Sequence, residues 1–502
     1  MRTNEAYTEL KKWFKTLRDL HNASEMLTVD GEMVMKPGSA NARGEVIETL
    51  AKLISQTTLD PKIPDLFADA EAGSAELSDA DRRNLVLMRR HYTHNACLPE
   101  ALSMEVAKAA FEGEQMHSEH RASGDWSVMG PVYTRNFKLA AEMGAYKKEA
   151  LGVETVHDAL IDSFSPGLST AIIDPYFAEL DEGLKRLIGR AKDRAAQSAA
   201  PLVQKGPFDV GAQETLNRKL LSCLGLDDQR AVFYFSEKAH PFMAGFRNDT
   251  RIVTRLSPEE FLSTIMGTLH EGGHALYEQN LPADWNDTKL GANMGMAVHE
   301  SQSMVIEYQA AMSEEYISYI AREAREAFDR ASDPAFTDDN MLTLMRRVEP
   351  SFIRIDADEV TYPSHIMLRY ELERDIFAGN LAVKDLPDAF NAKMEDKLGI
   401  TPPSNDKGVM QDVHWAGMLQ GYFPAYTFGA GLAAQLFAKA TSDHPEIKTE
   451  LRDGRFDTLR VWLNKNIHEK GSSLEYPDLV REATGEDLNP AAYLKHLESR
   501  YC

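Results

Sequence analysis

The sequence predicts a mainly α-helical protein with a small β element, and three observations support this prediction. Long stretches rich in Ala, Leu, Glu, Lys and Arg carry apolar residues at helical spacing. Only 31 glycines and 22 prolines occur among 502 residues, fewer than average usage predicts. Runs typical of β-strands are confined to residues 225–256. Without internal repeats, low-complexity tracts or a clear linker, we expect one continuous domain over residues 1–502.

Helices are expected throughout the N-terminal part of the chain, and in the first of them Leu10, Trp13 and Leu17 fall on one side. The expected ranges are 1–22, 43–57, 79–95, 99–112, 130–150, 175–198 and 210–224. None of these helices carries recognisable chemistry. We therefore expect residues 1–225 to form a helical wall or lid.

Two short β-rich runs separate these two parts of the chain. Ala231–Phe235 and Arg251–Arg255 are rich in aromatic and β-branched residues, and the turn sequence Arg247-Asn248-Asp249 lies between them. We expect a small β-hairpin or sheet edge next to the helix that follows. An extended peptide can add to such an edge by backbone hydrogen bonds.

The composition excludes several classes of partner. The formal net charge is −23, whereas proteins that bind a phosphate backbone need a basic face, so no nucleic acid is expected. No run of about 18 apolar residues occurs in the sequence, so no membrane span is expected. Three cysteines without C-x-x-C spacing, and a start without an apolar leader, are typical of a cytoplasmic protein.

The most informative stretch is His270-Glu271-Gly272-Gly273-His274. Residues i and i+4 of an α-helix lie on the same face, so His270 and His274 can bind one metal ion. Glu271 can then reach a water molecule in an open coordination position, as the general base does in the H-E-x-x-H pattern of zinc peptidases. Two histidines on an ordinary buried helix are the alternative interpretation.

The neighbouring residues favour a helix that carries this pattern. Ser257 and Pro258 are expected at its N-cap and first position, and apolar residues follow at helical spacing up to Leu269. Gly272 and Gly273 each cost roughly 1 kcal/mol relative to alanine inside a helix. Such a pair indicates a close approach to the helix backbone, and one interpretation is that it keeps side chains out of a narrow cleft beside the metal.

A catalytic zinc site needs a third protein ligand and one open position. Glu300 is the first candidate, because it lies on the next expected helix, which begins near Met294 and also carries His299. Glu307, about two turns further along the same face, is the alternative ligand or a hydrogen-bonding partner of one. In such a site the metal activates water and polarises the scissile carbonyl, and Glu271 moves the proton to the leaving amine.

A series of motifs in a fixed order extends over half of the sequence. It comprises His240-Pro241-Phe242, Asp249-x-Arg251, His270-Glu271-x-x-His274, His299-Glu300-Ser301-Gln302, Ile353-Arg354-x-x-Ala357-Asp358-Glu359, Gly408-x-x-Gln411-Asp412-x-His414-Trp415 and Gly421-Tyr422-Phe423-Pro424-Ala425-Tyr426. In these motifs and in its length, the chain resembles the thermostable carboxypeptidase (carboxypeptidase Taq) family of metallopeptidases. An ordered set of motifs is far more specific than H-E-x-x-H alone.

The resemblance implies an all-helical, gluzincin-type fold with a deep substrate cleft, and a homodimer. It also implies Zn²⁺ or Co²⁺ as the metal, Glu300 as the third ligand, and release of single amino acids from the C-termini of peptides. His240 and His299 are expected to support the site rather than to bind the metal. The chain departs from the family pattern Asp-x-Arg-x-Thr, because Val253 stands at the fifth position and the nearest threonine is Thr254.

An enzyme that acts at the C-terminus must bind a free carboxylate, which arginine does best through its planar guanidinium group. Arg354 is the first candidate and Arg251 the second. Acidic residues near Arg354 in the sequence are expected to hold it in place: Asp356, Asp358 and Glu359. For each arginine the alternative is an ion pair with a purely structural role.

Tyr422 and Tyr426 are the expected donors to the oxyanion, because a phenol can donate a hydrogen bond to developing charge in an apolar pocket. The alternative is that this tyrosine-rich run only forms a packed turn. His414 and Trp415 are expected to line the cleft or contact the substrate, and His414 can also donate to the intermediate. Asp412 is expected to orient His414.

These observations together predict a metal-dependent carboxypeptidase that acts on peptides with a free C-terminus. Residues 226–502, which contain the motifs, are expected to hold the metal site and to bind the substrate. An oligoendopeptidase or dipeptidase with the same HExxH/Glu zinc core is the alternative within the same class of enzyme. A helical scaffold that keeps the pattern without catalysing a reaction is the alternative from another class.

Overall fold

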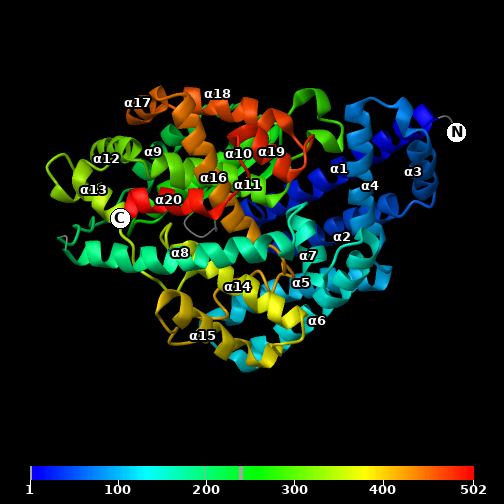
Figure 1. Ribbon diagram of the computed structural model, residues 1–502, viewed down its shortest axis with the longest axis horizontal. Coiled ribbons are helices and arrows are strands. Elements are labelled where there is room, and N and C mark those ends of the chain that lie inside the picture. The colour runs from blue at the N-terminus through cyan, green and yellow to red at the C-terminus, as the bar shows by residue number, and fades with distance from the viewer. Residues whose placement is uncertain (1–2, 198, 237–240) are drawn as a thin grey trace.

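The computed structural model describes residues 3–197, 199–236 and 241–502. Helices make up most of these residues (Figure 1). One small sheet packs against the helix that carries His270 and His274. The predicted mainly α-helical fold with a small β element is therefore confirmed. Within the described residues, no helix is both long enough and apolar enough to span a membrane.

The first part of the chain folds into helices that overlap every expected range. They are α1 (Thr3–Met33), α2 (Ala40–Thr58), α3 (Ile63–Ala72), α4 (Asp79–Ala96), α5 (Glu100–His120), α6 (Trp126–Leu151), α7 (Val156–Phe164), α8 (Thr170–Gln197) and α9 (Val210–Cys223). Helices α1 and α5 extend well beyond their expected ends, and α3 and α7 are additional. Helix α7 has a sequence signal, because Thr155 and Asp158 form a reciprocal capping box at its start.

Helices α1, α3 and α4 share a hydrophobic core of their own, to which Leu10, Trp13 and Phe67 belong. The indole nitrogen of Trp13 donates a hydrogen bond to the carbonyl of Thr57 at 2.8 Å, which joins α1 to α2. These helices lie together at one end of the molecule (Figure 1, blue). The main core is formed by elements that follow in the sequence, from Met129 onward. It contains Leu269, from the helix with the H-E-x-x-H pattern.

The sheet contains β1 (Ala231–Ser236), β2 (Phe242–Phe246) and β3 (Asp249–Arg255) in the order β1-β3-β2. The two expected strands, β1 and β3, pair in parallel, with Ala231 opposite Thr250. The hairpin is formed instead by β2 and β3, which are antiparallel. Because parallel neighbours need a long connection, the residues between β1 and β3 serve as that connection, and β2 is built from part of it.

Helix α10 (Leu262–Gln279) carries the H-E-x-x-H pattern and begins later than expected. The prediction of a helix start at Pro258 is wrong, because the carbonyl of Pro258 accepts a hydrogen bond from the backbone nitrogen of Phe208 at 2.8 Å. The carboxylate of Glu260 instead accepts a hydrogen bond from the backbone nitrogen of Ser263 at 3.1 Å. A side chain just before the helix therefore satisfies one of its first free N–H groups.

The two glycines of the pattern let other elements approach α10. A Cβ atom on Gly272 would lie 2.5 Å from Cδ1 of Leu224, the residue after α9. A Cβ atom on Gly273 would lie 2.6 Å from the backbone oxygen of Gln302 in α11 (Met296–Met304). The predicted close approach is confirmed. The interpretation that the glycines leave a narrow cleft open is wrong, because α11 and Leu224 fill that space.

The remaining helices complete the main core around α16, which packs against both α11 and α14 (Figure 1). They are a π-helix (Val305–Ala311), α12 (Glu314–Ala327), α13 (Asp338–Met345), α14 (Tyr362–Phe377), α15 (Leu386–Leu398), α16 (Pro424–Asp443), α17 (Glu446–Arg452), α18 (Asp457–Asn466), α19 (Tyr476–Thr484) and α20 (Pro490–Tyr501). The π-helix continues directly from α11. Such segments occur often at functional sites.

A buried carboxylate, that of Glu359, ties α20 to the rest of the molecule. It accepts hydrogen bonds from Arg500 at 2.9 Å, from Tyr501 at 2.8 Å and from His496 at 2.8 Å. Burial alone would raise the pKa of Glu359, but Arg500 and His496 outweigh burial and lower the pKa to about 2. The ionised form of Glu359 is therefore favoured by folding.

We expect Glu359 to make the protein sensitive to acid. Because its pKa falls from 4.5 to about 2 on folding, its contribution of about 3 kcal/mol is complete above pH 4.5 and is lost as the pH falls towards 2. Urea unfolding of the wild type and of Glu359→Gln checks this. The difference between their free energies of unfolding should shrink below pH 4.5, and a constant difference from pH 7 to pH 3 would contradict it.

Candidate metal centre and active site

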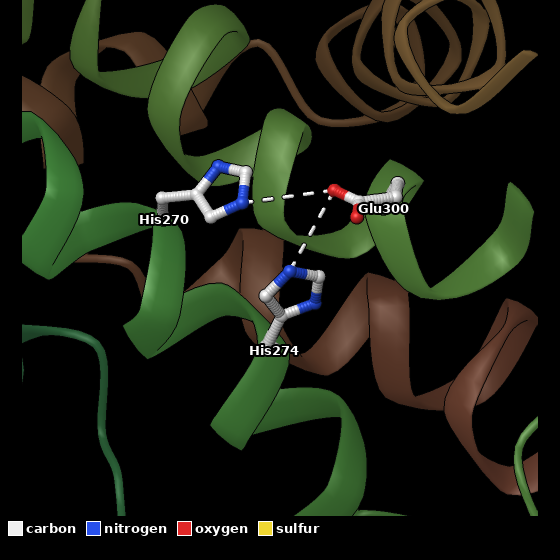
Figure 2. Close-up of side chains that lie close together, drawn as sticks. All are labelled: His270, His274 and Glu300. Carbon is white, nitrogen blue, oxygen red and sulfur yellow. Dashed lines mark ion pairs between the residues drawn. The ribbon is translucent and has the colours of Figure 1, made fainter. Parts of the chain in front are cut away.

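The imidazoles of His270 and His274 project from one face of α10 toward the carboxylate of Glu300 on α11 (Figure 2). Their Nε2 atoms each lie 3.6 Å from Oε2 of Glu300, and the three ligand atoms all lie within 4.8 Å of one another. A Cβ atom on Gly429 of α16 would lie 2.7 Å from Cβ of Glu300, so α16 approaches α11 closely there. The structure thus brings the three expected ligands together.

Each of the two histidines is oriented by a hydrogen bond at its other nitrogen. Nδ1 of His270 donates to Glu307 at 2.7 Å. Nδ1 of His274 faces Nδ1 of His299 at 2.6 Å, and Nε2 of His299 donates to Glu278 at 3.1 Å. These contacts assign the ring protons to Nδ1 of the two histidines. Their Nε2 atoms face Glu300, and each offers a lone pair when its ring is neutral.

This donor set fits a divalent metal of the zinc type. Two imidazole nitrogens and one carboxylate oxygen are the ligands of a catalytic His₂Glu site. Burial holds the pKa of His274 well below its usual range, so its ring is neutral. Burial also disfavours a charged His270, but Glu307 outweighs burial and raises the pKa of His270 to about 10. Metal binding therefore displaces a proton from His270 and weakens in acid.

Glu307 lies on the π-helix and orients His270 rather than joining the three ligand atoms. We expect Glu307→Ala to lower the metal affinity about 10- to 100-fold, because the ring of His270 loses its fixed orientation and basicity. Metal content in competition with a chelator measures the effect. Glu314→Ala, at an exposed position, is the control. Equal affinity in Glu307→Ala and the control would contradict this role.

Glu271 is buried directly beside the ligand histidines and is 8% exposed. Burial raises the pKa of its carboxyl group to about 7, while the charge of His270 opposes the shift. A carboxyl group with a pKa near neutrality can accept and return a proton at the pH of most cells. The geometry is thus compatible with the predicted general base.

Arg354 is held in a buried cluster of polar and aromatic side chains. Its Nε and Nη2 atoms donate to Oδ1 of Asp412 at 3.0 Å and 2.9 Å. Its Nη1 atom donates to the hydroxyl of Tyr362 at 3.0 Å. The guanidinium carbon also lies 5.0 Å from the centre of the Tyr426 ring. Arg354 is therefore fixed at several points beside a tyrosine that was itself expected in the site.

The prediction that Asp356, Asp358 and Glu359 hold Arg354 is wrong. Asp358 accepts hydrogen bonds from backbone groups of its own turn, and Glu359 faces α20. The carboxylate that holds Arg354 is the distant Asp412. The expectation that Asp412 orients His414 is also wrong for hydrogen bonding among the described residues, because Asp412 accepts from two arginines.

The second arginine, Arg369, was not expected in the site. Its Nε atom donates to Oδ2 of Asp412 at 2.7 Å, and its side chain is only 1% exposed. Burial opposes the charge of Asp412, but the two arginines hold its pKa far below the ordinary range. Two guanidinium groups thus share one carboxylate. The sequence signal was available, because Arg369 interrupts the apolar run Ile366-Met367-Leu368.

Tyr422, Tyr426 and His414 lie together between the arginine cluster and the metal ligands. The hydroxyl of Tyr422 donates to Oε1 of Glu300 at 3.2 Å. Nε2 of His414 lies 3.2 Å from the hydroxyl of Tyr426. Burial lowers the pKa of His414 to about 3 and raises the pKa of both tyrosines well above their usual range. All three side chains are therefore neutral and able to donate.

The segment that carries these residues is held by Glu373 of α14. Its carboxylate accepts hydrogen bonds from the indole nitrogen of Trp415 at 2.7 Å and from the backbone nitrogen of Gly421 at 2.8 Å. Trp415 is only 3% exposed and packs against Phe137. It therefore supports the segment from within the core, and the expectation that Trp415 lines the cleft is wrong.

Arg251 lies apart from this cluster, on β3. Its guanidinium group donates to both carboxylate oxygens of Asp249, at 2.6 Å and 2.8 Å, and to the hydroxyl of Tyr234 at 3.3 Å. In the same strand, the hydroxyl of Thr254 accepts a hydrogen bond from Thr268 of α10 at 3.1 Å. Thr254, which follows the Val253 that departs from the family pattern, thus joins the sheet to α10. The first residue of the motif at 240–242 lies outside the described residues.

A helical fold with an H-E-x-x-H helix and a glutamate from the next helix defines a metallopeptidase. More specifically, the chain belongs to the carboxypeptidase Taq (M32) metallopeptidase family, whose model matches residues 9–501. It is 35% identical over 515 aligned positions to thermostable carboxypeptidase 1 of Thermus thermophilus, covering 100% of this chain and 99% of that one.

Other carboxypeptidases are similar to this chain over nearly its whole length. Carboxypeptidase 1 of Bacillus subtilis is 31% identical and is covered to 99%, as is this chain. The structure of metallocarboxypeptidase 1 from Trypanosoma cruzi superposes with a TM-score of 0.93 at 33% identity, with 99% of each chain covered. The predicted family and the predicted metal-dependent carboxypeptidase activity are therefore confirmed.

Proposed function

We propose that the protein releases single amino acids from the C-termini of peptides, with a zinc ion bound by His270, His274 and Glu300. The observation that carries this proposal is the excess positive charge near those ligands, where Arg354 and Arg369 share the single carboxylate of Asp412. A buried charge needs a partner. The α-carboxylate of a peptide supplies one, and an internal segment of a peptide does not.

Arg354 is the arginine proposed to bind that carboxylate. Its neighbour Tyr426 lies 5.2 Å from Tyr422, measured between ring centres, and Tyr422 contacts the ligand Glu300. Two aromatic rings, those of Tyr426 and Tyr422, therefore connect the guanidinium group to a metal ligand. Arg251 is the second candidate for this role, on a different element.

A divalent metal supplies Lewis-acid chemistry to such a site, lowering the pKa of a water molecule and polarising the scissile carbonyl. The buried Glu271 would accept a proton from the attacking water and deliver it to the leaving amine, and its raised pKa supports this role. Tyr422, Tyr426 and His414 supply neutral donors for the negative charge that develops on the carbonyl oxygen. Their fixed positions reduce the reorganisation that the reaction requires.

The decisive experiment compares two peptides of the same sequence, one with a free C-terminus and one with a C-terminal amide. Mass spectrometry should detect stepwise loss of terminal residues from the free peptide, and a chelator should stop this loss. The amidated peptide should remain nearly intact. Efficient internal cleavage of the amidated peptide would instead favour an oligoendopeptidase.

Four further properties belong to the proposal. Zinc is favoured by the His₂Glu donor set, and metal analysis of the purified protein tests it against cobalt. A homodimer is implied by the family resemblance, and light scattering tests it. A cytoplasmic location is supported by three unpaired cysteines, and cell fractionation tests it. A single domain with residues 1–225 as wall or lid is testable by limited proteolysis.

A further inference from the structure

A cavity of about 560 Å³ lies beside the metal helix, enclosed by α1, α4, the β2–β3 turn and the loop 286–293. Glu278, near the C-terminal end of α10, forms part of its wall. Because Glu278 also contacts His299, which contacts the ligand His274, the cavity begins directly behind the metal ligands. It is separate from the cluster around Arg354.

The cavity contains basic side chains without partners. Lys289, His21 and His91 all line it, and within the described residues none of their three side chains has a hydrogen bond or an ion pair. Burial lowers the pKa of Lys289 and also that of His91, to about 3. Lys289 therefore provides a partly buried charge, and the two imidazoles provide neutral donors.

The acidic side chains of the cavity are already engaged. The carboxylate of Glu25 accepts a hydrogen bond from the backbone nitrogen of Gly245 at 2.7 Å. Glu278 accepts from Asn293 at 2.8 Å as well as from His299. Asp19 is paired with Lys15 and Arg18. Within the described residues, none of these carboxylates forms an ion pair with Lys289.

The position of the cavity relates it to the path of a peptide. Arg354 lies near the His270 end of the site. It contacts Tyr362, and Tyr362 packs against Tyr308 of the π-helix. The same π-helix carries Glu307, which contacts His270. The cavity lies at the opposite end, because Glu278 is one helical turn beyond His274, about 6 Å along α10. A peptide whose terminal carboxylate is at Arg354, and which runs along α10 past the metal ligands, therefore extends toward the cavity.

We propose that this cavity binds the part of the substrate that precedes the scissile bond, and that Lys289 selects an acidic side chain there. This inference rests on the proposed C-terminal activity and deepens it by naming the class of peptide. An extended chain advances about 3.3–3.6 Å per residue, so the second to fourth residues before the scissile bond come within reach of the cavity. A carboxylate at one of them supplies the partner that Lys289 lacks.

The test uses blocked peptides that share one C-terminal residue and differ at a single upstream position. Aspartate, its neutral isostere asparagine, and lysine are compared at the second, third and fourth residues before the scissile bond. The enzymes are the wild type, Lys289→Met, the charge reversal Lys289→Glu, and Lys62→Met as a control at an exposed lysine. Thermal unfolding verifies that each variant is folded, and a blocked dipeptide measures catalysis without upstream contacts.

The wild type and Lys62→Met should prefer aspartate over asparagine about tenfold in kcat/KM at one position, as expected for a charge-assisted hydrogen bond. Lys289→Met should lose that preference and Lys289→Glu should favour lysine there, while all four enzymes cleave the blocked dipeptide equally. Release of C-terminal residues without any aspartate preference would overturn the subsite alone. A preference for aspartate that persists in Lys289→Met would also overturn the subsite. If no C-terminal residues are released at all, both the subsite and the proposed function are overturned.

Discussion

Replacement of Glu271 by glutamine is expected to remove nearly all turnover while the metal stays bound. Glutamine keeps the shape of the side chain but cannot accept the proton of the attacking water. General-base catalysis contributes about 10²–10⁴-fold, so kcat should fall about a thousandfold. The three ligand atoms belong to other residues, so the metal content should remain that of the wild type.

Two measurements separate the loss of a base from damage to the site. Metal analysis and thermal unfolding of Glu271→Gln should match those of the wild type. Glu259→Gln, at an exposed position before α10, provides a matched control that should keep full activity. A variant at Glu271 with more than about a tenth of the wild-type kcat would exclude this residue as the base, because such a loss is too small for general-base catalysis.

The local sequence pattern predicts most helices correctly. It fails where contacts with residues distant in the sequence determine the backbone conformation. Helix α4 lies within a residue of its expected range, because capping and apolar spacing agree there. The start of α10 was placed too early, since Pro258 is held by Phe208 from a different segment. Strand β2 was missed because it is short and contains Gly245 at a positive φ of 99°, a combination that weakens strand signals.

In the candidate site too, local spacing predicts some residues correctly but misses contacts between residues that are distant in the sequence. His270 and His274 follow from helical periodicity alone, and the structure places Glu300 beside them as the family motif implies. The relation between Arg354 and Asp412 spans 58 positions in sequence, and local charge pattern favoured the wrong acids. Glu278 had a usable signal, because it continues the four-residue spacing of the two histidines on one helix face.

Substitution of Arg354 should affect substrates with a free C-terminus far more than amidated ones. In its proposed role, Arg354 makes a charge-assisted contact to the terminal carboxylate that Arg354→Ala removes, and truncation of one partner in such a buried pair costs about 2–5 kcal/mol. We expect kcat/KM for free peptides to fall at least about thirtyfold. The loss should fall mainly on KM, because the carboxylate is bound alike in the ground state and the transition state.

Because Asp412 has a second arginine partner, Arg354→Ala should remove carboxylate binding without destabilising the fold. When Arg354 is removed, Asp412 keeps Arg369 at 2.7 Å, so no carboxylate is left buried without a partner and the fold should persist. Arg354→Lys retains the charge without the planar geometry and should be intermediate. Arg251→Ala should have a small effect, since that arginine is paired with Asp249. Equal losses on free and amidated peptides would assign Arg354 a structural role, and a large selective loss in Arg251→Ala would transfer carboxylate binding to β3.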